Sequence, residues 1–149
     1  MRQFLAAAMG TNFSKKELLI GTPCNQIRHM FDLVTSDSST VCIIGEIKDY
    51  SWRKGMDFPN RKFEEVKDDL GRLQLAPAPF QRKLLILRED ISIEGRSLIS
   101  SFIKRLSNGQ LLNGIEVWGY SQGSTLESDS ATQLYGPNTG VTLRLTDSK

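Results

Sequence analysis

The spacing of hydrophobic residues changes several times along the chain, and each spacing predicts a different element. Short apolar stretches near the N-terminus predict helices over residues 2–9 and 14–20. The second helix would have Ser14 as its N-cap and Glu17 three residues later, the pattern of a capping box. The Gly-Thr-Pro sequence at residues 21–23 is expected to end this helical start.

Two extended runs follow, over residues 27–35 and 40–47. A stretch of serine and aspartate at residues 36–39 separates them and has the composition of a turn. We therefore expect the two runs to pair as a β-hairpin. Residues 49–60 contain a glycine and a proline and are expected to form a loop.

In the second half of the chain, helical stripes alternate with short apolar runs. From residue 61, apolar residues recur three and four positions apart, which predicts an amphipathic helix with Asn60 as its cap and a Pro-rich end at residues 76–79. A second stripe at residues 98–106 predicts another helix, ended by an Asn-Gly pair. The apolar runs between and after them predict strands over residues 83–88 and 115–120, the first buried on both faces.

A hairpin followed by helix, strand, helix and strand predicts an α/β fold with a mixed central β-sheet flanked by helices. The 149 residues leave room for one domain over residues 1–149, with a core at about 14–120. The tail, residues 121–149, is rich in Ser, Thr and Gly, and we expect a tail or a terminal hairpin from residues 134–135 and 141–145.

Composition narrows the class of protein. Hydrophobic residues make up 39% and charged residues 24%, which is enough for a packed core. Nineteen Lys and Arg against seventeen Asp and Glu leave a net charge of +2, so any nucleic-acid surface must be a local patch. No apolar run approaches the roughly 18 residues that span a bilayer, and the N-terminal stretch lacks the features of a secretion signal. We expect no membrane partner.

The two cysteines, Cys24 and Cys42, stand in no metal-ligand spacing. A disulfide between them is one interpretation, but two buried thiols in a reducing, cytoplasmic compartment are the simpler one. The single histidine excludes any site built on several imidazoles.

Polar residues interrupt the apolar run that ends at residue 48. Because side chains alternate along a strand, Glu46 and Lys48 project to one face together with Ile44, while Ile47 points to the other. Antiparallel pairing can bring Asp32 beside Glu46. Two adjacent carboxylates repel unless a cation lies between them, and oxygen ligands suit Mg²⁺. Lys48 would then lie beside a metal-bound water.

The sequence from Asp32, through thirteen intervening residues, to Glu46-Ile47-Lys48 resembles the PD-(D/E)xK nuclease superfamily, which has the restriction-endonuclease-like fold. The likeness covers about residues 14–120 and includes the order of helix, three-stranded meander, helix and strand. It implies a DNA endonuclease dependent on Mg²⁺ or Mn²⁺ and free of any organic cofactor. Asp32, Glu46 and the backbone carbonyl of Ile47 would bind the ion, and Lys48 would position the attacking water.

The same resemblance implies Glu17 as a further metal ligand from the preceding helix, and a homodimer as the assembly. Simpler interpretations remain open. Lys48 can extend from a strand end and pair with Glu46, while Asp32 can be a turn residue. His29 is expected to be a surface or core residue. The alternative function is a non-catalytic member of the fold that binds nucleic acid or a protein.

A cluster after the motif predicts contact with DNA phosphates, with the tryptophan stacking on a base. Its members are Trp52, Arg53, Lys54, Arg61 and Lys62. Acidic residues nearly balance this segment, so an ordinary solvated helix face is an equal interpretation. They are Asp57, Glu64, Glu65, Asp68 and Asp69.

A competing motif lies at residues 119–123, where Gly-Tyr-Ser-Gln-Gly matches the nucleophile elbow of α/β-hydrolases. Ser121 would be the nucleophile. That family places its histidine after the serine, but the only histidine here is His29, and residues 124–130 carry no helical stripe. We therefore expect a polar loop after a strand.

Overall fold

The computed structural model describes residues 1–36, 41–77, 80–125 and 128–145. Within them, seven strands form one sheet in which the order of strands follows the order of the sequence. The strands are β1 (Phe13–Thr22), β2 (Asn25–Thr35), β3 (Ile43–Lys48), β4 (Arg82–Arg88), β5 (Glu116–Ser121), β6 (Ser130–Tyr135) and β7 (Thr142–Arg144). The helices are α1 (Arg2–Met9), α2 (Asn60–Gln74) and α3 (Leu98–Ser107).

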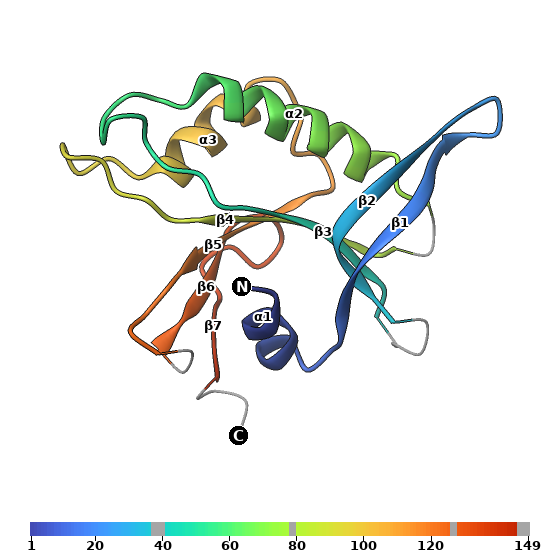
Figure 1. The fold of residues 1–149 in the computed structure, drawn as a ribbon, viewed down its shortest axis with the longest axis horizontal. Helices are drawn as coiled ribbons and strands as arrows, with labels where there is room; N and C mark the ends of the chain where they lie inside the picture. Colours follow the sequence, from blue (N-terminus) through green and yellow to red (C-terminus); the bar gives the residue numbers. More distant parts are fainter. Residues whose placement is uncertain (37–40, 78–79, 126–127, 146–149) are drawn as a thin grey trace.

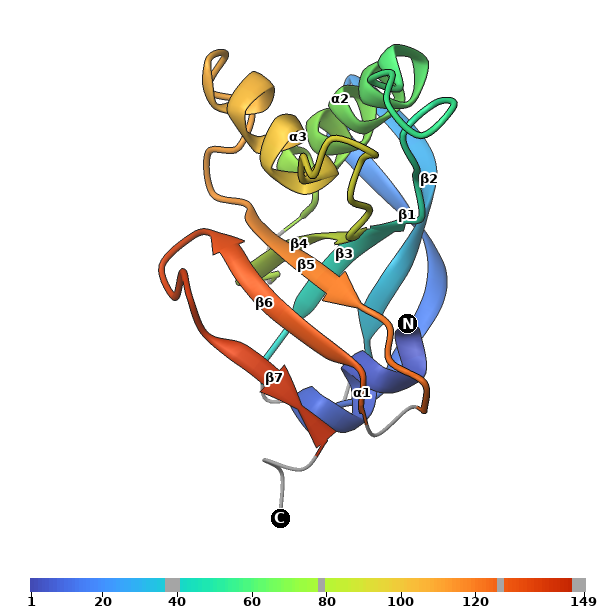
Figure 2. The same ribbon diagram turned by 90° about the vertical axis from the view of Figure 1, so that its left-hand side faces the viewer.

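The sheet is mixed, as expected. The pairs β3–β4 and β4–β5 are parallel, because α2 and α3 carry the chain back between them, and the other neighbouring pairs are antiparallel. Helices α2 and α3 cover one face of the sheet and α1 lies against the other (Figures 1 and 2). The α/β class with a mixed sheet is confirmed.

Two separate cores lie on the two faces of the sheet. In β3, Ile44 packs into the core under α2 and α3, whereas Ile43 packs into the core against α1. In β4, Leu85 and Leu84 divide in the same way. A strand buried on both faces needs apolar residues at every position, which explains the unbroken apolar run of β4.

The helices bury the stripes that the sequence predicts, but one cap differs. Ser97 precedes α3 and its hydroxyl accepts a hydrogen bond from the backbone N–H of Ser100. Asn60 was expected to cap α2, yet it is the first helical residue. Pro59 occupies the cap position and makes no side-chain capping bond.

The expected helix over residues 14–20 is wrong, because this segment is part of β1. It pairs with β2 in an antiparallel ladder that ends in a tight turn after Gly21, whose φ is 102°. Leu18 and Ile20, two residues apart, face the core, while Leu19 between them is exposed. This spacing is that of a strand, and the local capping pattern is overridden by pairing with β2.

The expected hairpin of residues 27–35 and 40–47 is confirmed as β2 and β3, which pair antiparallel. The turn expected at residues 36–39 lies mostly outside the described residues. The N-terminal helix is confirmed as α1, and the terminal hairpin is confirmed as β6 and β7.

The expectation of two buried thiols is wrong. Cys24 is exposed in the turn between β1 and β2, Cys42 is half-buried before β3, and both are free thiols. Among the described residues, no helix is both long enough and apolar enough to cross a membrane.

Candidate active site

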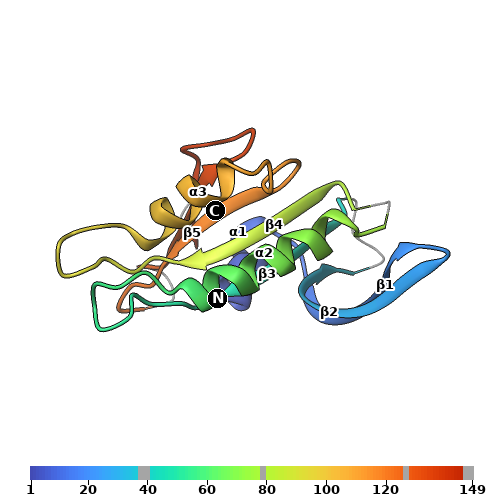
Figure 3. The same cartoon turned by 90° about the horizontal axis from the view of Figure 1, so that it is seen from above.

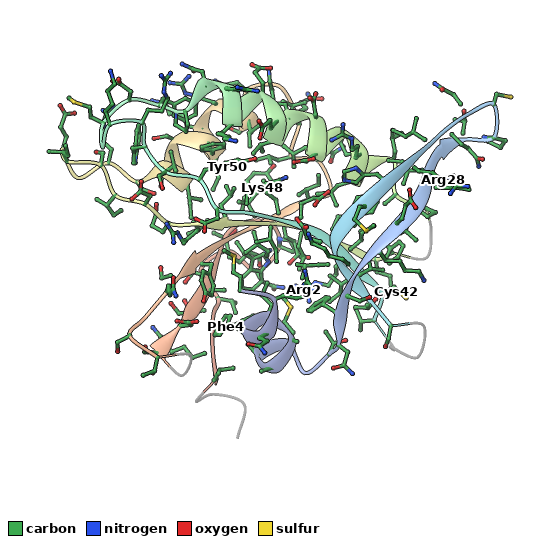
Figure 4. All side chains as sticks on the ribbon, in the orientation of Figure 1. Arg2, Phe4, Arg28, Cys42, Lys48 and Tyr50 are labelled. Carbon is green, nitrogen blue, oxygen red and sulfur yellow. The ribbon has the colours of Figure 1, made fainter. Side chains whose placement is uncertain are left out.

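The strand β3 presents Lys48 to the face covered by α2 (Figure 4), where its ammonium group meets Asp69. Glu46 lies two residues before Lys48 and shares this face. Glu46 follows Gly45, where a Cβ would lie 2.8 Å from the carbonyl oxygen of Leu84. Glycine therefore lets β3 approach β4 closely and sets the depth at which Glu46 lies. The residue is only 2% exposed, which is unusual for a carboxylate.

Asp32 lies where β2 separates from β3. Leu33 pairs with Gly45 in the ladder between the two strands. Next to this pair, the Asp32 carboxylate accepts a hydrogen bond from the backbone N–H of Ile47 at 3.0 Å. Lys15 of β1 approaches the other carboxylate oxygen at 3.6 Å. The side chain of Asp32 thus holds β3 in place and lies next to Glu46.

His29 was expected to be a surface or core residue, but it belongs to the site. Its Nε2 lies 2.5 Å from Oε1 of Glu46, and its ring packs edge-on against Phe31. Burial lowers the pKa of His29, and the positive charges of Arg72 and Lys48 lower it further. The neutral imidazole is therefore favoured in the folded protein.

The pKa of Glu46 is raised from 4.5 to about 8. Burial is the first cause, and the hydrogen bond and negative charge of Asp32 add to it, followed by the charge of Asp69. Lys48 opposes the shift without cancelling it. At neutral pH the isolated protein therefore keeps a proton on Glu46 unless another cation replaces it.

Asp69 completes the site from α2, and sequence reasoning missed it. Lys48 Nζ lies 2.6 Å from one of its carboxylate oxygens, and an Arg72 guanidinium nitrogen lies 3.0 Å from the other. Burial acts to lower the pKa of Lys48, but its hydrogen bond to Asp69 and the charge of that carboxylate outweigh burial and raise it. Lys48 is therefore charged.

A sequence signal for the two missed residues does exist. Asp69 falls on the buried stripe of α2, between Val66 and Leu73 and beside Leu70. An acidic residue on an apolar stripe is rarely there without a partner. His29 lies two residues before the buried Phe31, and strand alternation places both on the face toward α2.

The atoms of His29, Glu46 and Asp69 that can ligate a metal all lie within 4.8 Å of one another. Opposite ligands of a small divalent ion are about 4.2 Å apart, so little movement is needed to close the group around one. One imidazole nitrogen and two carboxylates, with Asp32 adjacent, are suitable donors for a divalent cation. Asp69 would have to exchange its Lys48 contact for the ion.

Glu17, expected as a further ligand, does not join this group. It lies on β1 opposite Met30, its side chain is exposed, and the helix that would have carried it toward the site is a strand. The described residues thus offer a candidate ligand from α2, Asp69, where the resemblance implied one from a preceding helix.

The expected DNA-contacting residues divide into two sets. Trp52 is 6% exposed, its indole N–H donates to the carbonyl of Asp90 at 3.0 Å, and Arg96 covers its ring. The ring packs into the core, while Trp52 also borders the hollow described next, so its stacking on a base stays a prediction. The other four residues are exposed, and Lys54 lies in a turn. Arg53, Arg61 and Lys62 line a surface hollow of about 510 Å³, which Tyr50 also lines.

Ser121 ends β5 and is exposed. In the part of the chain that the structure describes, no helix follows it before β6, and the only histidine is bonded to Glu46. Ser121 therefore lies in a polar loop after a strand, as expected. The described residues around it do not supply the helix and the histidine that accompany a nucleophile elbow.

Comparison with known proteins adds no relative: no family model matches the chain, and no curated protein or solved structure matches it. The chemistry of the site residues is therefore what bears on function.

Proposed function

We propose that this protein is a divalent-metal-dependent nuclease that hydrolyses phosphodiester bonds in DNA. The observation that carries the proposal is the burial of Glu46 beside Asp32, Asp69 and His29. Three carboxylates and one imidazole that converge in one place are costly to bury unless a cation or proton neutralises them. A group of this kind is common at catalytic sites.

Mg²⁺ or Mn²⁺ would be held by the carboxylates of Glu46 and Asp69, with Asp32 beside them, because these ions prefer oxygen ligands. His29 offers a nitrogen at the same place. When bound, the ion would polarise the phosphate and lower the pKa of the attacking water. Lys48 would orient that water and neutralise the charge that develops on the phosphate. For this role its ammonium group has to leave Asp69, and Arg72 remains there to hold the carboxylate in position.

The surface hollow after β3 supports DNA as the substrate. Tyr50 lies two residues beyond Lys48, and Arg53, Arg61 and Lys62 line the same hollow. Cationic side chains of this kind bind the phosphate backbone and position it without reading sequence. DNA that lies in the hollow would therefore run past Lys48.

Membership of the PD-(D/E)xK superfamily remains part of the proposal. The Asp32…Glu46-Ile47-Lys48 pattern supports it, as does the order of β2, β3, α2 and β4 around the site. The strand β1 in place of the expected upstream helix, and the contribution of Asp69 from α2, are departures from the expected arrangement.

A non-catalytic member of the same fold is the second candidate, and one observation favours it. Asp69 is already neutralised by Lys48 and Arg72, so this part of the cluster is satisfied as a structural ion pair. In that case the chain would bind nucleic acid or protein without cutting.

The test is an assay of cleavage during titration with Mg²⁺ or Mn²⁺ on supercoiled plasmid, single-stranded DNA and branched DNA. We expect cleavage that requires the ion, is lost in Glu46→Gln and persists in Glu94→Gln, a matched change at an exposed glutamate. Cleavage that survives in Glu46→Gln would contradict the proposal. A wild-type protein that neither cuts DNA nor binds the ions would favour the scaffold.

A further inference from the structure

The β1–β2 hairpin extends from the body of the protein as a two-stranded ribbon (Figures 1 and 3). In the ladder between β1 and β2, Phe13 pairs with Thr35 at the base of the ribbon and Thr22 pairs with Asn25 at its tip. Leu18 pairs with His29 between these ends. Every residue from 21 to 28 is exposed. Neither face of the tip is therefore covered by the rest of the molecule.

An uncovered ribbon of this kind is poorly stabilised by itself, since an isolated two-stranded hairpin is marginal in water. It nevertheless exposes large apolar side chains, with Leu19 at 51%, Met30 at 51% and Ile27 at 45% exposure. Leu19 and Met30 share the face of the ribbon that carries Arg28, and Ile27 lies on the other face. Exposed apolar residues that share a face indicate a surface that contacts a partner.

The chemistry of the ribbon favours a polyanion. Lys15, Lys16 and Arg28 stand on it together with two carboxylates, Glu17 and Asp32, and Asp32 pairs with Lys15. In the tip, residues 21–28, the one charged side chain is the cation of Arg28. At the tip, Asn25 and Gln26 present exposed amides. Amide and guanidinium groups are the side chains that form paired hydrogen bonds with the edges of adenine and guanine, and exposed aliphatic groups contact the thymine methyl.

The size of the ribbon also suits duplex DNA. Asn25 is four positions before His29, which corresponds to about 13 Å along a strand. The major groove is about 12 Å wide and about 8.5 Å deep, and it accommodates a two-stranded β-ribbon. The free part of the ribbon is thus long enough to reach the floor of the groove.

We propose that the tip of the β1–β2 ribbon, residues 21–28, enters the major groove of duplex DNA and holds the duplex against the site at its base. His29 and Asp32 belong to the same strand, β2, so DNA held by the tip lies next to the site residues. The identity of the partner as DNA rests on the proposed function. The ribbon adds a second contact region, at the end of the site opposite the hollow formed by Tyr50, Arg53, Arg61 and Lys62.

The experiment measures fluorescence anisotropy of a labelled duplex with the full chain in EDTA, over a series of salt concentrations. The variants are Arg28→Glu and the double change Asn25→Ala with Gln26→Ala. Lys104→Glu is the matched control, because Lys104 is an exposed cation on α3. We expect Arg28→Glu to raise Kd about tenfold and to lower the slope of log Kd against log salt by about 1, with no change in the control. The amide variant should lose preference among duplex sequences.

The same proteins are then assayed with Mn²⁺ and bis(p-nitrophenyl) phosphate, a phosphodiester too small to reach the tip of the ribbon from the site. Unchanged hydrolysis of this substrate with weakened duplex binding supports the ribbon proposal. If the wild type hydrolyses neither substrate, the nuclease proposal fails, while the binding data still decide the role of the ribbon. The ribbon proposal is overturned if Arg28→Glu, Lys104→Glu and the wild type bind the duplex with equal Kd values. A dimeric wild type that Arg28→Glu makes monomeric, with DNA affinity unchanged, also overturns it and assigns the ribbon to a second copy of the chain.

Discussion

Two glutamates are buried in the same sheet and have opposite surroundings. Glu116 of β5, 6% exposed, accepts two hydrogen bonds from the Arg82 guanidinium at 2.9 and 2.8 Å. Gln133 and Trp118 donate to it as well, at 3.1 and 3.3 Å. Glu46 of β3 has no arginine of this kind among the described residues; its closest neighbour is His29, with Asp32 and Asp69 nearby.

The two carboxylates differ in whether the fold supplies a counter-charge. The charge of Glu116 is matched by a bidentate guanidinium, and the same hydrogen bonds raise the pKa of Arg82. The fold thus supplies the counter-charge for Glu116. Around Glu46 the fold places the carboxylates of Asp32 and Asp69 instead, so the charge of Glu46 has to be neutralised by a proton or an added cation.

The largest expected effect comes from changing the two glutamates in parallel. Glu46→Gln should lower the rate of DNA cleavage by about 10²–10³-fold, because an electrostatic contribution to the transition state is lost. Its free energy of unfolding at neutral pH should not fall, since Glu46 is already largely protonated there. Cleavage kinetics and urea unfolding on the same protein sample measure both quantities.

Glu116→Gln should do the reverse. It leaves the Arg82 charge without its partner and should lower the free energy of unfolding by about 2 kcal/mol, less than a fully buried pair because Arg82 is about one-third exposed. The cleavage rate per folded molecule should stay at the wild-type level. If both variants lost the same property, the contrast between the two glutamates would be wrong.

Lys48→Ala sharpens the comparison within the site. We expect cleavage to fall about 100-fold, since Lys48 acts on water and phosphate in the transition state. Affinity for Mn²⁺ should be unchanged or higher, because a positive charge beside Asp69 has been removed. Isothermal titration calorimetry distinguishes this from Glu46→Gln, and wild-type cleavage by Lys48→Ala would show that the catalytic lysine is misassigned.

The pH dependence of stability should expose Glu46 directly. Because its folded pKa is raised to about 8 from 4.5, its stabilising contribution is complete below the unfolded value and is lost as pH rises toward 8. His29 acts in the opposite sense: its folded pKa is lowered, so its contribution is present above 6.5 and is lost as pH falls below that value. The two effects overlap, and the wild type has to be compared with Glu46→Gln.

In EDTA, the free energy of unfolding of the wild type should fall relative to Glu46→Gln between about pH 5 and about pH 8, by at most about 1.4 kcal/mol per pH unit. Urea titrations across this range give the difference. Parallel curves for the two proteins would show that Glu46 titrates normally and that its surroundings resemble those of Glu116.

The smallest expected effect is that of Ser121→Ala. Ser121 is exposed at the end of β5, and the described residues place no base to activate it, so cleavage and stability should not change. Covalent labelling of Ser121 by a fluorophosphonate probe would contradict this and restore the hydrolase interpretation.

Much of the frame follows from local pattern. The stripes of α2 and α3 and the apolar runs of β4 and β5 are strong signals, and alternation along β3 correctly placed Glu46 with Ile44. The strand β1 did not follow from its sequence, because Ser14 and Glu17 mimic a helix start and only pairing with β2 decides the outcome.

The site was only partly accessible to sequence reasoning for a similar reason. Glu46 and Lys48 share one strand, so their relation is local. Asp69 comes from the helix that crosses over the sheet, and its distance from Lys48 depends on how α2 packs on β3. Alternation with Phe31 indicates the face on which His29 lies, but its contact with Glu46 required the register of β2 against β3.

The central claim is that the surroundings of Glu46 bind a cation that those of Glu116 do not require. Calorimetric titration of the wild type, Glu46→Gln and Glu116→Gln with Mn²⁺ and Mg²⁺ tests it most directly. We expect saturable binding by the wild type and by folded Glu116→Gln, and loss of binding in Glu46→Gln. Equal binding by all three proteins, or no binding by the wild type even with DNA present, would contradict the claim.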